Sequence, residues 1–454
     1  MTRSKKQSSD HNPSRMSARA AIANHLKIVC TVTTLLAVAT GCTHDGKPLL
    51  PGFNAQAGSP ANAEPPRPKN VWPVQGVWVV RQAWSSPDQI ATVMDQCYQL
   101  GLNSVFFQVR GEGTAYYRSS IEPWAREFDW RDPGFDPLEV ACREAHRRGL
   151  ALHAWVNVMP AWRGDTPPDH PQQLYNARPD WFLYDQNGKR QPLGWYSSVN
   201  PCLPEVREYL TSVCREIVTR YPVDGLHLDY IRFPVDESPR GSDYPHDRKT
   251  LALYHQATGK RPGDSKQAWS AWRADQVTRL VSQISHMVRR QGDDVKLTTA
   301  CTPDMNTARN RYFQDAPRWA REDLIDAAII MNYAADTDFY RRRQETWRRT
   351  IGATAAAGIG VYMHKSPQAT REQIALAQSW GTGYVLFSDK VLFTRTEKAN
   401  AYASAVRDQI GKTVAHQRPK PLAASQSPAS ENQAGNSEGP RNSSTVNHPY
   451  GIVP

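Results

Sequence analysis

Short apolar runs alternate with amphipathic helical segments through the middle of this chain, and this repeat limits the possible folds most. Repeated strand–helix units favour a parallel sheet, and Ser86-Pro87, Asp136-Pro137 and Ser366-Pro367 each supply a capping residue and a helix-opening Pro. Eight such units predict an α/β fold, a (β/α)8 barrel. A doubly wound sheet is the alternative, but no GxGxxG or Walker loop supports it. The expected strands are 74–80, 104–109, 151–156, 225–229, 296–300, 327–331, 360–363 and 384–387.

Composition indicates where the folded part begins and ends. With 39% hydrophobic residues and 14 Trp in 454 residues, the chain can bury a large core. We expect 71–412 to form the barrel domain, with a long insertion at 159–201 after the third strand. Residues 43–70 are rich in Pro, Ala and Gly and should form a flexible tether, whereas 413–454 are rich in Ser, Asn and Pro and should be a disordered tail.

The first 42 residues resemble an export signal. A basic stretch leads into the apolar run 28–39, which is too short to span a bilayer but suits a signal peptide. The run ends in Ala39-Thr40-Gly41-Cys42, which resembles a bacterial lipobox, and an ordinary cleaved signal is the alternative. Because Thr43 is not the Asp of inner-membrane retention, we expect lipidation at Cys42 and an outer-membrane anchor facing the periplasm or the cell surface.

Charge and cysteine usage exclude several classes of partner. The net charge is +11, but the export segment carries much of it and the remaining basic residues lie among acidic ones, so we expect no nucleic-acid partner. The body has no CxxC pair, which argues against a disulfide scaffold or a Cys-based zinc site. Cys97 and Cys142 fall in successive expected helices and could form a disulfide, with small buried thiols as the alternative.

Polar residues gather where the expected strands end. A (β/α)8 barrel places its active site at these carboxyl ends, so they should meet at one pole. Because side chains alternate along a strand, His227 and Asp229 should share one face, as should His153, Trp155 and Asn157. The other residues of this polar set are Arg110, Glu112, Arg232, Asp304, Asn332 and Tyr333.

The runs GVWVV, NSVFFQVRG, GFDPLEVACREAHRRGLALHAWVNV, VDGLHLDYIRFP and IIMNY resemble the glycosyl-hydrolase-like 10 family over roughly residues 74–390. This family consists of bacterial envelope proteins with a barrel related to retaining glycosidases. The resemblance implies cleavage of a glycosidic bond in an envelope or extracellular polysaccharide, and some members are associated with the glycan strands of peptidoglycan. In related barrels an Asp at the end of strand four is the nucleophile, which favours a retaining mechanism.

Glycoside hydrolysis requires two carboxyl groups, one protonated and one ionised. Asp229 is the strongest candidate for the nucleophile or base, because it ends the fourth strand among apolar residues. An ion pair with Arg232 or Arg110 that only shapes the site is the alternative for Asp229. The partner acid stays open between Asp304, which is slightly favoured, and Glu112, which lies in a Gly-flanked loop where backbone can approach a ligand closely. Outside candidates are Asp236, Glu237 and Asp336.

Carbohydrate binding would use aromatic faces and planar polar groups. The insertion at 159–201 is rich in aromatic residues, among them Trp162, and Trp155 lies on the third strand. Arg232, like Arg110, suits a charged substrate such as a muramic carboxylate. Hydroxyl or N-acetyl groups would be contacted by Arg110, His153, Asn157, His227, Asn332 and Tyr333.

Two other functions compete with a metal-independent hydrolase. His153, His227, Asp229 and Asp304 could form a His/carboxylate metal site, but no HxH or HExxH spacing is present, and we expect neither metal nor cofactor. A non-catalytic glycan-binding lipoprotein that tethers the membrane to the wall would use the same aromatic loop. The sequence leaves the sugar, the linkage and the oligomeric state open.

Overall fold

The computed structural model describes residues 65–68, 71–234, 238–292 and 294–414. The chain divides into two units, residues 1–59 and 60–454, and every described residue belongs to the second. The predicted signal, Cys42, most of the tether, nearly all of the tail, and the acids Asp236 and Glu237 therefore lie outside the described residues. None of the helices described is long and apolar enough to cross a membrane.

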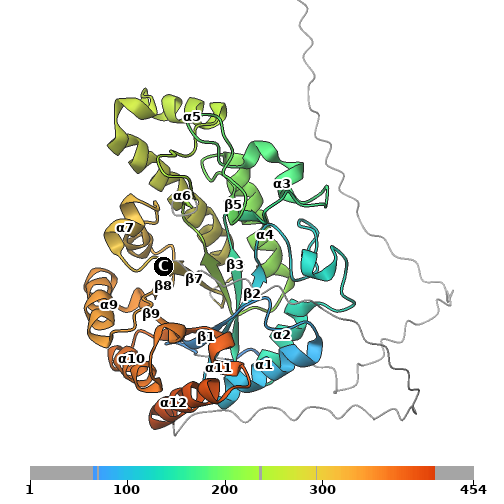
Figure 1. Cartoon of the computed structure of the whole chain (residues 1–454), viewed down its shortest axis with the longest axis vertical. Coiled ribbons are helices and arrows are strands. Elements are labelled where there is room, and N and C mark those ends of the chain that lie inside the picture. Colours follow the sequence, from blue (N-terminus) through green and yellow to red (C-terminus); the bar gives the residue numbers. More distant parts are fainter. Residues whose placement is uncertain (1–64, 69–70, 235–237, 293, 415–454) are drawn as a thin grey trace, which may run out of the picture. The chain divides into compact units, whose positions relative to one another are not determined.

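Eight parallel strands close into a barrel in the order β1-β10-β9-β8-β7-β6-β3-β2 (Figure 1). The predicted (β/α)8 fold is thus confirmed. The strands are β1 Gln75–Val79, β2 Ser104–Arg110, β3 Ala151–Asn157, β6 Gly225–Asp229, β7 Lys296–Cys301, β8 Ala327–Met331, β9 Ala355–Gly360 and β10 Tyr384–Phe387.

Helices surround this barrel (Figure 1), and the predicted start signals open three of them. The Ser86 side chain accepts a hydrogen bond from the backbone N–H of Gln89, and Asp136 accepts from Leu138 and Glu139. Ser366 precedes the third helix without a side-chain cap bond. The main helices are α1 Pro87–Gln99, α2 Pro137–His146, α4 Pro204–Arg220, α6 Lys266–Arg289, α8 Ala316–Arg321, α9 Thr337–Ile351, α10 Pro367–Trp380 and α12 Glu397–Val414.

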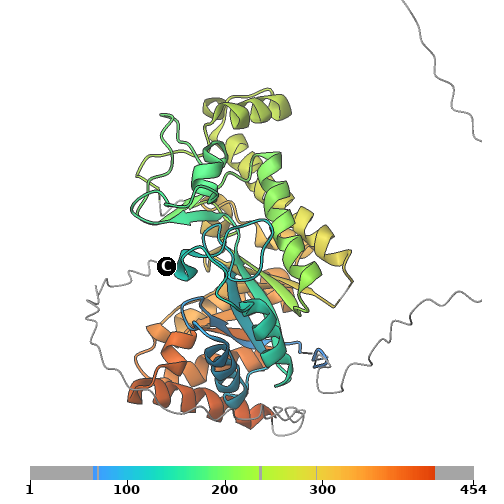
Figure 2. The ribbon, with the colours of Figure 1, turned by 90° about the vertical axis from the view of Figure 1, so that its right-hand side faces the viewer.

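Insertions follow β3 and β6, the third and fourth barrel strands. The predicted insertion after β3 contains an antiparallel hairpin of β4 Pro160–Arg163 and β5 Tyr196–Ser198. In Figure 2 this green hairpin and α5 Arg248–Thr258 lie at the opposite end of the view from the red helix α12. The remaining short elements are η2 Arg126–Phe128, α3 Leu174–Ala177, η3 Pro179–Trp181, η4 Pro262–Asp264, α7 Met305–Asn310, η5 Gly352–Thr354, η6 Val361–Met363 and α11 Asp389–Phe393.

Two apolar layers hold the barrel together. Leu152, Leu226 and Ile330 face the helices in one cluster, whereas Trp78 and Phe106 fill the barrel interior in another. The alternation of side chains along each strand produces this separation. It also places the side chains at alternate strand positions inside the barrel.

The seventh barrel strand was predicted at the wrong place. It spans Ala355–Gly360, and most of the predicted 360–363 forms η6 instead. Ala and Gly are poor strand formers, so the sequence favoured the more β-prone residues downstream. The strand needs small residues, because a Cβ on Gly358 would lie 2.6 Å from the carbonyl oxygen of Ile330 and 3.1 Å from the Trp78 ring.

The five cysteines of the described part are buried thiols. Cys97 and Cys142 lie in α1 and α2 within the core between helices and strands. A disulfide between them is therefore absent, and the alternative of small buried thiols is confirmed.

Candidate active site

Asp229 ends β6 and lies opposite Asn157 of the neighbouring strand β3. Asp229 is only 6% exposed, and this burial raises the pKa of its carboxyl group. Arg232, at 3.5 Å, and the backbone N–H of Tyr230, at 2.7 Å, oppose the rise, as does the indole N–H of Trp155. The fourth strand therefore presents a buried carboxyl group whose pKa is raised by burial, and Arg232 and the Tyr230 N–H act against this rise.

The chain turns sharply directly after this carboxylate. Tyr230 has a φ of 50°, a backbone conformation that residues with a side chain rarely adopt. Its ring contacts Tyr196 of the insertion edge-on at 5.1 Å, and Arg232 lies 4.5 Å from its centroid. Such backbone strain persists only where the surroundings fix it, and it is frequent at functional sites.

Asn157 lies beside Asp229 and has an unsatisfied group. Its side-chain amide donates to the hydroxyl of Tyr196 at 3.4 Å, but its Oδ1 atom is buried with no hydrogen-bond partner within the described part of the chain. Leaving a buried acceptor without a donor is costly. The position next to Asp229 suits a donor supplied by a ligand hydroxyl.

Tyr333, Phe387 and Tyr362 form an aromatic wall at the same pole. Tyr333 stacks on Phe387 at 5.3 Å, and Tyr362 meets both rings edge-on. Burial, followed by the charge of Asp229, raises the pKa of Tyr333, which places this ring within the field of the carboxylate. A Cβ on Gly360 would lie 2.7 Å from Cβ of Tyr333, so a glycine at this position leaves space for the Tyr333 side chain.

Glu112 is the other buried carboxyl group among the predicted catalytic residues. It is 1% exposed, hydrogen bonds to Arg81, and lies 3.7 Å from Arg126, while its Oε1 atom has no hydrogen-bond partner in the described structure. Burial raises its pKa, and Arg81 opposes that shift. A carboxyl group with a raised pKa is suited to donate a proton.

The glycines beside Glu112 serve packing against the protein. A Cβ on Gly111 would lie 2.5 Å from Cζ of Arg81, and Gly113, with φ of 71°, lies against the carbonyl oxygen of Ala161. The loop therefore approaches Arg81 and β4, where the sequence had suggested close approach to a ligand. Arg81 itself was missed, because a single Arg after the first strand gives no pattern that links it to Glu112.

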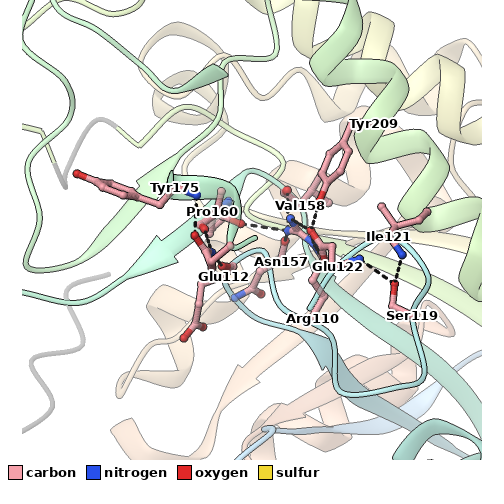
Figure 3. Close-up of polar contacts among 12 residues, drawn as sticks. Arg110, Glu112, Ser119, Ile121, Glu122, Asn157, Val158, Pro160, Tyr175 and Tyr209 are labelled. Atoms are coloured by element: carbon pink, nitrogen blue, oxygen red, sulfur yellow. Dashed lines mark hydrogen bonds and ion pairs between the residues drawn. The ribbon is translucent and has the colours of Figure 1, made fainter. Parts of the chain in front are cut away.

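Arg110 is a structural residue. It is fully buried, and its guanidinium binds both carboxylate oxygens of Glu122 and the carbonyl oxygens of Asn157, Val158 and Pro160 (Figure 3). It thereby fixes the chain where β3 leads into the insertion. The prediction that Arg110 binds substrate hydroxyls or pairs with Asp229 does not fit this geometry, because its charge is already paired.

His227 is also structural. The indole of Trp78, which can only donate, hydrogen bonds to Nε2 of His227 at 3.0 Å, so this nitrogen carries no proton. The other nitrogen, Nδ1, therefore holds the proton and donates to Oγ1 of Thr298 at 2.9 Å. Burial lowers the pKa of His227 and keeps the ring neutral. A substrate-binding role for His227 is not supported, because both ring nitrogens are occupied.

His153 is buried in the barrel interior and stacks on Phe106 at 4.5 Å. A Cβ on Gly225 would lie 2.0 Å from its ring, so β6 needs a glycine at this position. Neither ring nitrogen has a hydrogen-bond partner in the described structure, and burial lowers the pKa of His153 to about 4, with the charge of Asp224 opposing. The ring lies below the carboxylate layer and is neutral.

Protonation of His153 should weaken the fold in acid. Its folded pKa of about 4 lies below the ordinary value of 6.5, so the unfolded chain binds the proton more readily. Stability from this residue is present above pH 6.5 and falls by about 3 kcal/mol as pH decreases to 4. Urea unfolding at pH 7 and pH 4.5 gives the free energy of unfolding at each pH. Between these two values it should decrease less for His153→Gln than for the parent.

The matched control is His255→Gln, because His255 is exposed on α5. This variant should keep the parental dependence of stability on pH. Equal pH dependence in the parent and in His153→Gln would contradict the assignment of a neutral buried ring.

The side chains of Asp304 and Asn332 form hydrogen bonds with helices α7 and α9. Asp304 is exposed and caps α7 by accepting the N–H of Thr307 at 2.8 Å, and hydrogen bonds from Thr307 lower its pKa. A general acid needs the opposite shift, so the favoured prediction for Asp304 is not supported. Asn332 donates to the carbonyl oxygen of Tyr340 in α9, which directs its amide away from the pole. The outsider Asp336 likewise caps α9 through Phe339.

Trp162 belongs to the core of the insertion. It is buried, donates to the carbonyl oxygen of Thr166 at 2.8 Å, and stacks on Trp130 with 6.3 Å between ring centroids. Arg126, which approaches Glu112, also lies over the Trp162 ring at 5.2 Å. Trp162 therefore links the insertion to the Glu112 loop, and the half-buried Trp130 and Trp195 offer more accessible rings.

Metal ligands do not assemble at this pole. Within the residues that the structure describes, no three His, Cys, Asp or Glu side chains form a group that could hold a metal ion. The predicted metal ligands have separate roles in the structure. His153 and His227 lie in the barrel interior, whereas Asp304 caps α7.

The closed (β/α)8 barrel is similar in fold to solved glycosidases. The catalytic domain of β-amylase from Paenibacillus polymyxa superposes with a TM-score of 0.51 at 7% identity, covering 74% of this chain and 98% of that one. A β-galactosidase from Marinomonas ef1 gives a TM-score of 0.51 at 13% identity, covering 75% and 59%. These likenesses concern the fold alone.

The chain belongs to the glycosyl hydrolase-like 10 family, whose sequence profile matches residues 73–378. The glycosyl hydrolase DigH of Escherichia coli K12 is 31% identical over 318 residues, which cover 59% of this chain and 67% of that protein. The glycosyl hydrolase YngK of Bacillus subtilis is 29% identical over 212 residues, covering 45% of this chain and 38% of YngK. The predicted family is confirmed.

Proposed function

We propose that this protein is a glycoside hydrolase that cleaves a glycosidic bond in an envelope or extracellular polysaccharide, such as the glycan strands of peptidoglycan. The observation that carries the proposal is the buried Asp229 at the end of β6, which Arg232 and the Tyr230 N–H hold in place. Membership of a glycosyl hydrolase-like family supports the same reaction class.

In the proposed reaction, Asp229 attacks the anomeric carbon while Glu112 gives its proton to the departing glycosidic oxygen. The C–O bond to the leaving sugar breaks and a glycosyl ester on Asp229 forms. Glu112, now ionised, then takes a proton from water, which attacks the ester and regenerates Asp229. This two-step reaction retains the anomeric configuration and is typical of carboxyl groups about 5 to 5.5 Å apart.

The test is the release of oligosaccharides from purified, peptide-free peptidoglycan glycan and from a panel of plant and algal polysaccharides. Mass spectrometry identifies the products, and NMR of the first-formed anomer distinguishes retention from inversion. Cleavage of a glycosidic bond with retention is the expected result. If the folded full chain releases no product from any of these glycans, the proposal is overturned.

A glycan-binding lipoprotein without hydrolase activity is the second candidate. It is favoured by the arginines that face both carboxyl groups, Arg232 at Asp229 and Arg81 at Glu112, because an ion pair can be purely structural. In that case the parent chain would bind glycan without releasing any product, and Asp229→Asn would weaken binding because Arg232 loses its partner.

We further propose that Cys42 carries the lipid anchor, that the barrel faces the periplasm or the cell surface, and that the anchor lies in the outer membrane. Cells grown with an alkyne-labelled palmitate should incorporate label into the parent and lose it in Cys42→Ser. The Cys42→Ser protein should also leave the membrane fraction. Label that persists in Cys42→Ser would contradict this site of modification.

A further inference from the structure

Tyr196 is the first residue of β5, and it lies beside the strand that ends in Asp229. Its ring contacts that of Tyr230, the residue after Asp229, at 5.1 Å between centroids. Its hydroxyl accepts a hydrogen bond at 3.4 Å from the side-chain amide of Asn157, which lies opposite Asp229 in the barrel. The hairpin of the insertion therefore brings a phenol, only 5% exposed, close to the candidate nucleophile.

Tyr196 also lies close to the residues around Glu112. Burial lowers the pKa of Arg81, which hydrogen bonds to Glu112, but Tyr196 and then Glu112 raise it well above its ordinary value. Arg163 pairs with Tyr196 across the hairpin, and its guanidinium lies 5.5 Å from the centroid of the Tyr196 ring. Burial raises the pKa of Glu112, and Arg163 is one of three arginines that oppose this rise. Tyr196 is therefore shared by the surroundings of both candidate carboxyl groups.

Asn157 and Tyr196 together leave one donor and one acceptor without a partner. The phenolic O–H has no acceptor, and Oδ1 of Asn157 has no donor, among the residues that the structure describes. If the amide were rotated by 180°, the O–H would donate to Oδ1, and the pair would again leave an N–H donor and an acceptor lone pair. Asn157 is 1% exposed, so such unmet groups are costly until a ligand completes them.

A hydroxyl group matches this pair, because its single oxygen atom donates to one partner and accepts from the other at the same time. A carboxylate only accepts, and would leave the acceptor of the pair unmatched. The N–H and C=O of a trans secondary amide point in opposite directions, so one acetamido group does not reach both partners. The pair therefore selects a free sugar hydroxyl.

We propose that Asn157 and Tyr196 bind one free hydroxyl group of the sugar unit that reacts with Asp229, and that Tyr196 thereby helps to determine specificity. The inference rests on the proposed function, because it assigns a substrate contact within that same site. Hydrogen bonds to a hydroxyl close to the reacting carbon strengthen as the transition state forms. Tyr196 should therefore contribute to kcat as well as to KM.

Tyr196→Phe removes the hydroxyl and keeps the ring that contacts Tyr230. With peptide-free peptidoglycan glycan as the substrate, kcat/KM should fall about 10- to 100-fold, because the bound sugar hydroxyl then lacks a partner. Tyr184→Phe is the matched control, since Tyr184 lies in the same insertion and its hydroxyl donates to the carbonyl oxygen of Pro179 at 3.2 Å. The control should stay within about twofold of the parent.

A binding experiment with altered sugars tests the contact itself. Calorimetry measures the affinity of the full chain carrying Asp229→Asn for cellotetraose and chitotetraose, which differ at C2, and for forms of each that lack the hydroxyl at C3 or at C6. Loss of the hydroxyl at one of these positions should weaken binding about 10- to 100-fold. The same loss should cost less than about twofold when Tyr196→Phe is also present.

Equal losses of affinity with and without the Tyr196 hydroxyl, or no binding to any of these sugars, overturn the inference. A fall in kcat/KM for Tyr184→Phe as large as that for Tyr196→Phe also overturns it.

Hydrolysis is measured separately in the chain with native Asp229, so the two proposals fail in different ways. A hydroxyl preference that depends on Tyr196, without cleavage, keeps the contact and removes the hydrolase. Cleavage without such a preference keeps the hydrolase and removes the contact.

Discussion

Asp229→Asn is expected to reduce hydrolysis of the glycan by at least about 10³-fold, because the amide cannot form the glycosyl ester that the mechanism requires. The substitution keeps the size of the side chain and the N–H contact from Tyr230. Affinity for the intact glycan should therefore change by no more than about threefold. Initial rates and calorimetry on the same preparations provide the comparison.

A residue that only shapes the site would behave differently. Asp229→Asn would then weaken binding and lower the melting temperature together, since Arg232 loses its buried partner at 3.5 Å. Loss of cleavage with retained affinity is specific to a catalytic carboxylate. Undiminished cleavage by Asp229→Asn would remove Asp229 from the chemistry.

Glu112→Gln and Asp304→Asn form a matched pair for the general acid. Glu112→Gln should lower kcat by roughly 10²- to 10⁴-fold on a natural glycan, because no proton reaches the leaving oxygen. Asp304→Asn should stay within about threefold of the parent, because Asn caps a helix about as well as Asp. The reverse result would restore Asp304 as the acid.

A structural role of Glu112 can be separated from an acid role by the leaving group. An aryl glycoside whose phenol departs without protonation should be cleaved almost normally by Glu112→Gln if the residue is the acid. The basic limb of the pH–rate profile should also disappear, since that limb reports the acid losing its proton. An equal loss on both substrates would mean that Glu112 mainly positions Arg81.

The barrel could be predicted from the sequence because seven of its strands contain apolar or β-branched runs between strong turn and cap signals. The seventh strand broke this rule, since Ala356 and Gly358 are small for a reason that lies elsewhere in the chain. Trp78 of β1 occupies the barrel interior next to Gly358. A pattern within one segment cannot report which distant side chain will fill the space beside it.

The candidate site was only partly predictable for similar reasons. Asp229 lies at the end of β6 as expected. Asn332 follows Met331 directly, so its side chain lies on the face opposite to that of Met331. The alternation of side chains along a strand could have predicted this orientation. Arg110 finds its carboxylate in Glu122, twelve residues away in an irregular loop, and no spacing rule relates them. Asp304 and Asp336 were ordinary helix caps placed next to the pole.

The buried guanidinium of Arg110 has a consequence for how such proteins can diversify. It holds the carbonyl oxygens of Asn157, Val158 and Pro160, so the root of the insertion is anchored by backbone atoms, whatever side chains follow. Segments grafted from relatives between 164 and 195 should therefore dock on an unchanged base. Under the proposed function, exchange of this segment would change which glycan is bound, while the barrel and Asp229 stay the same.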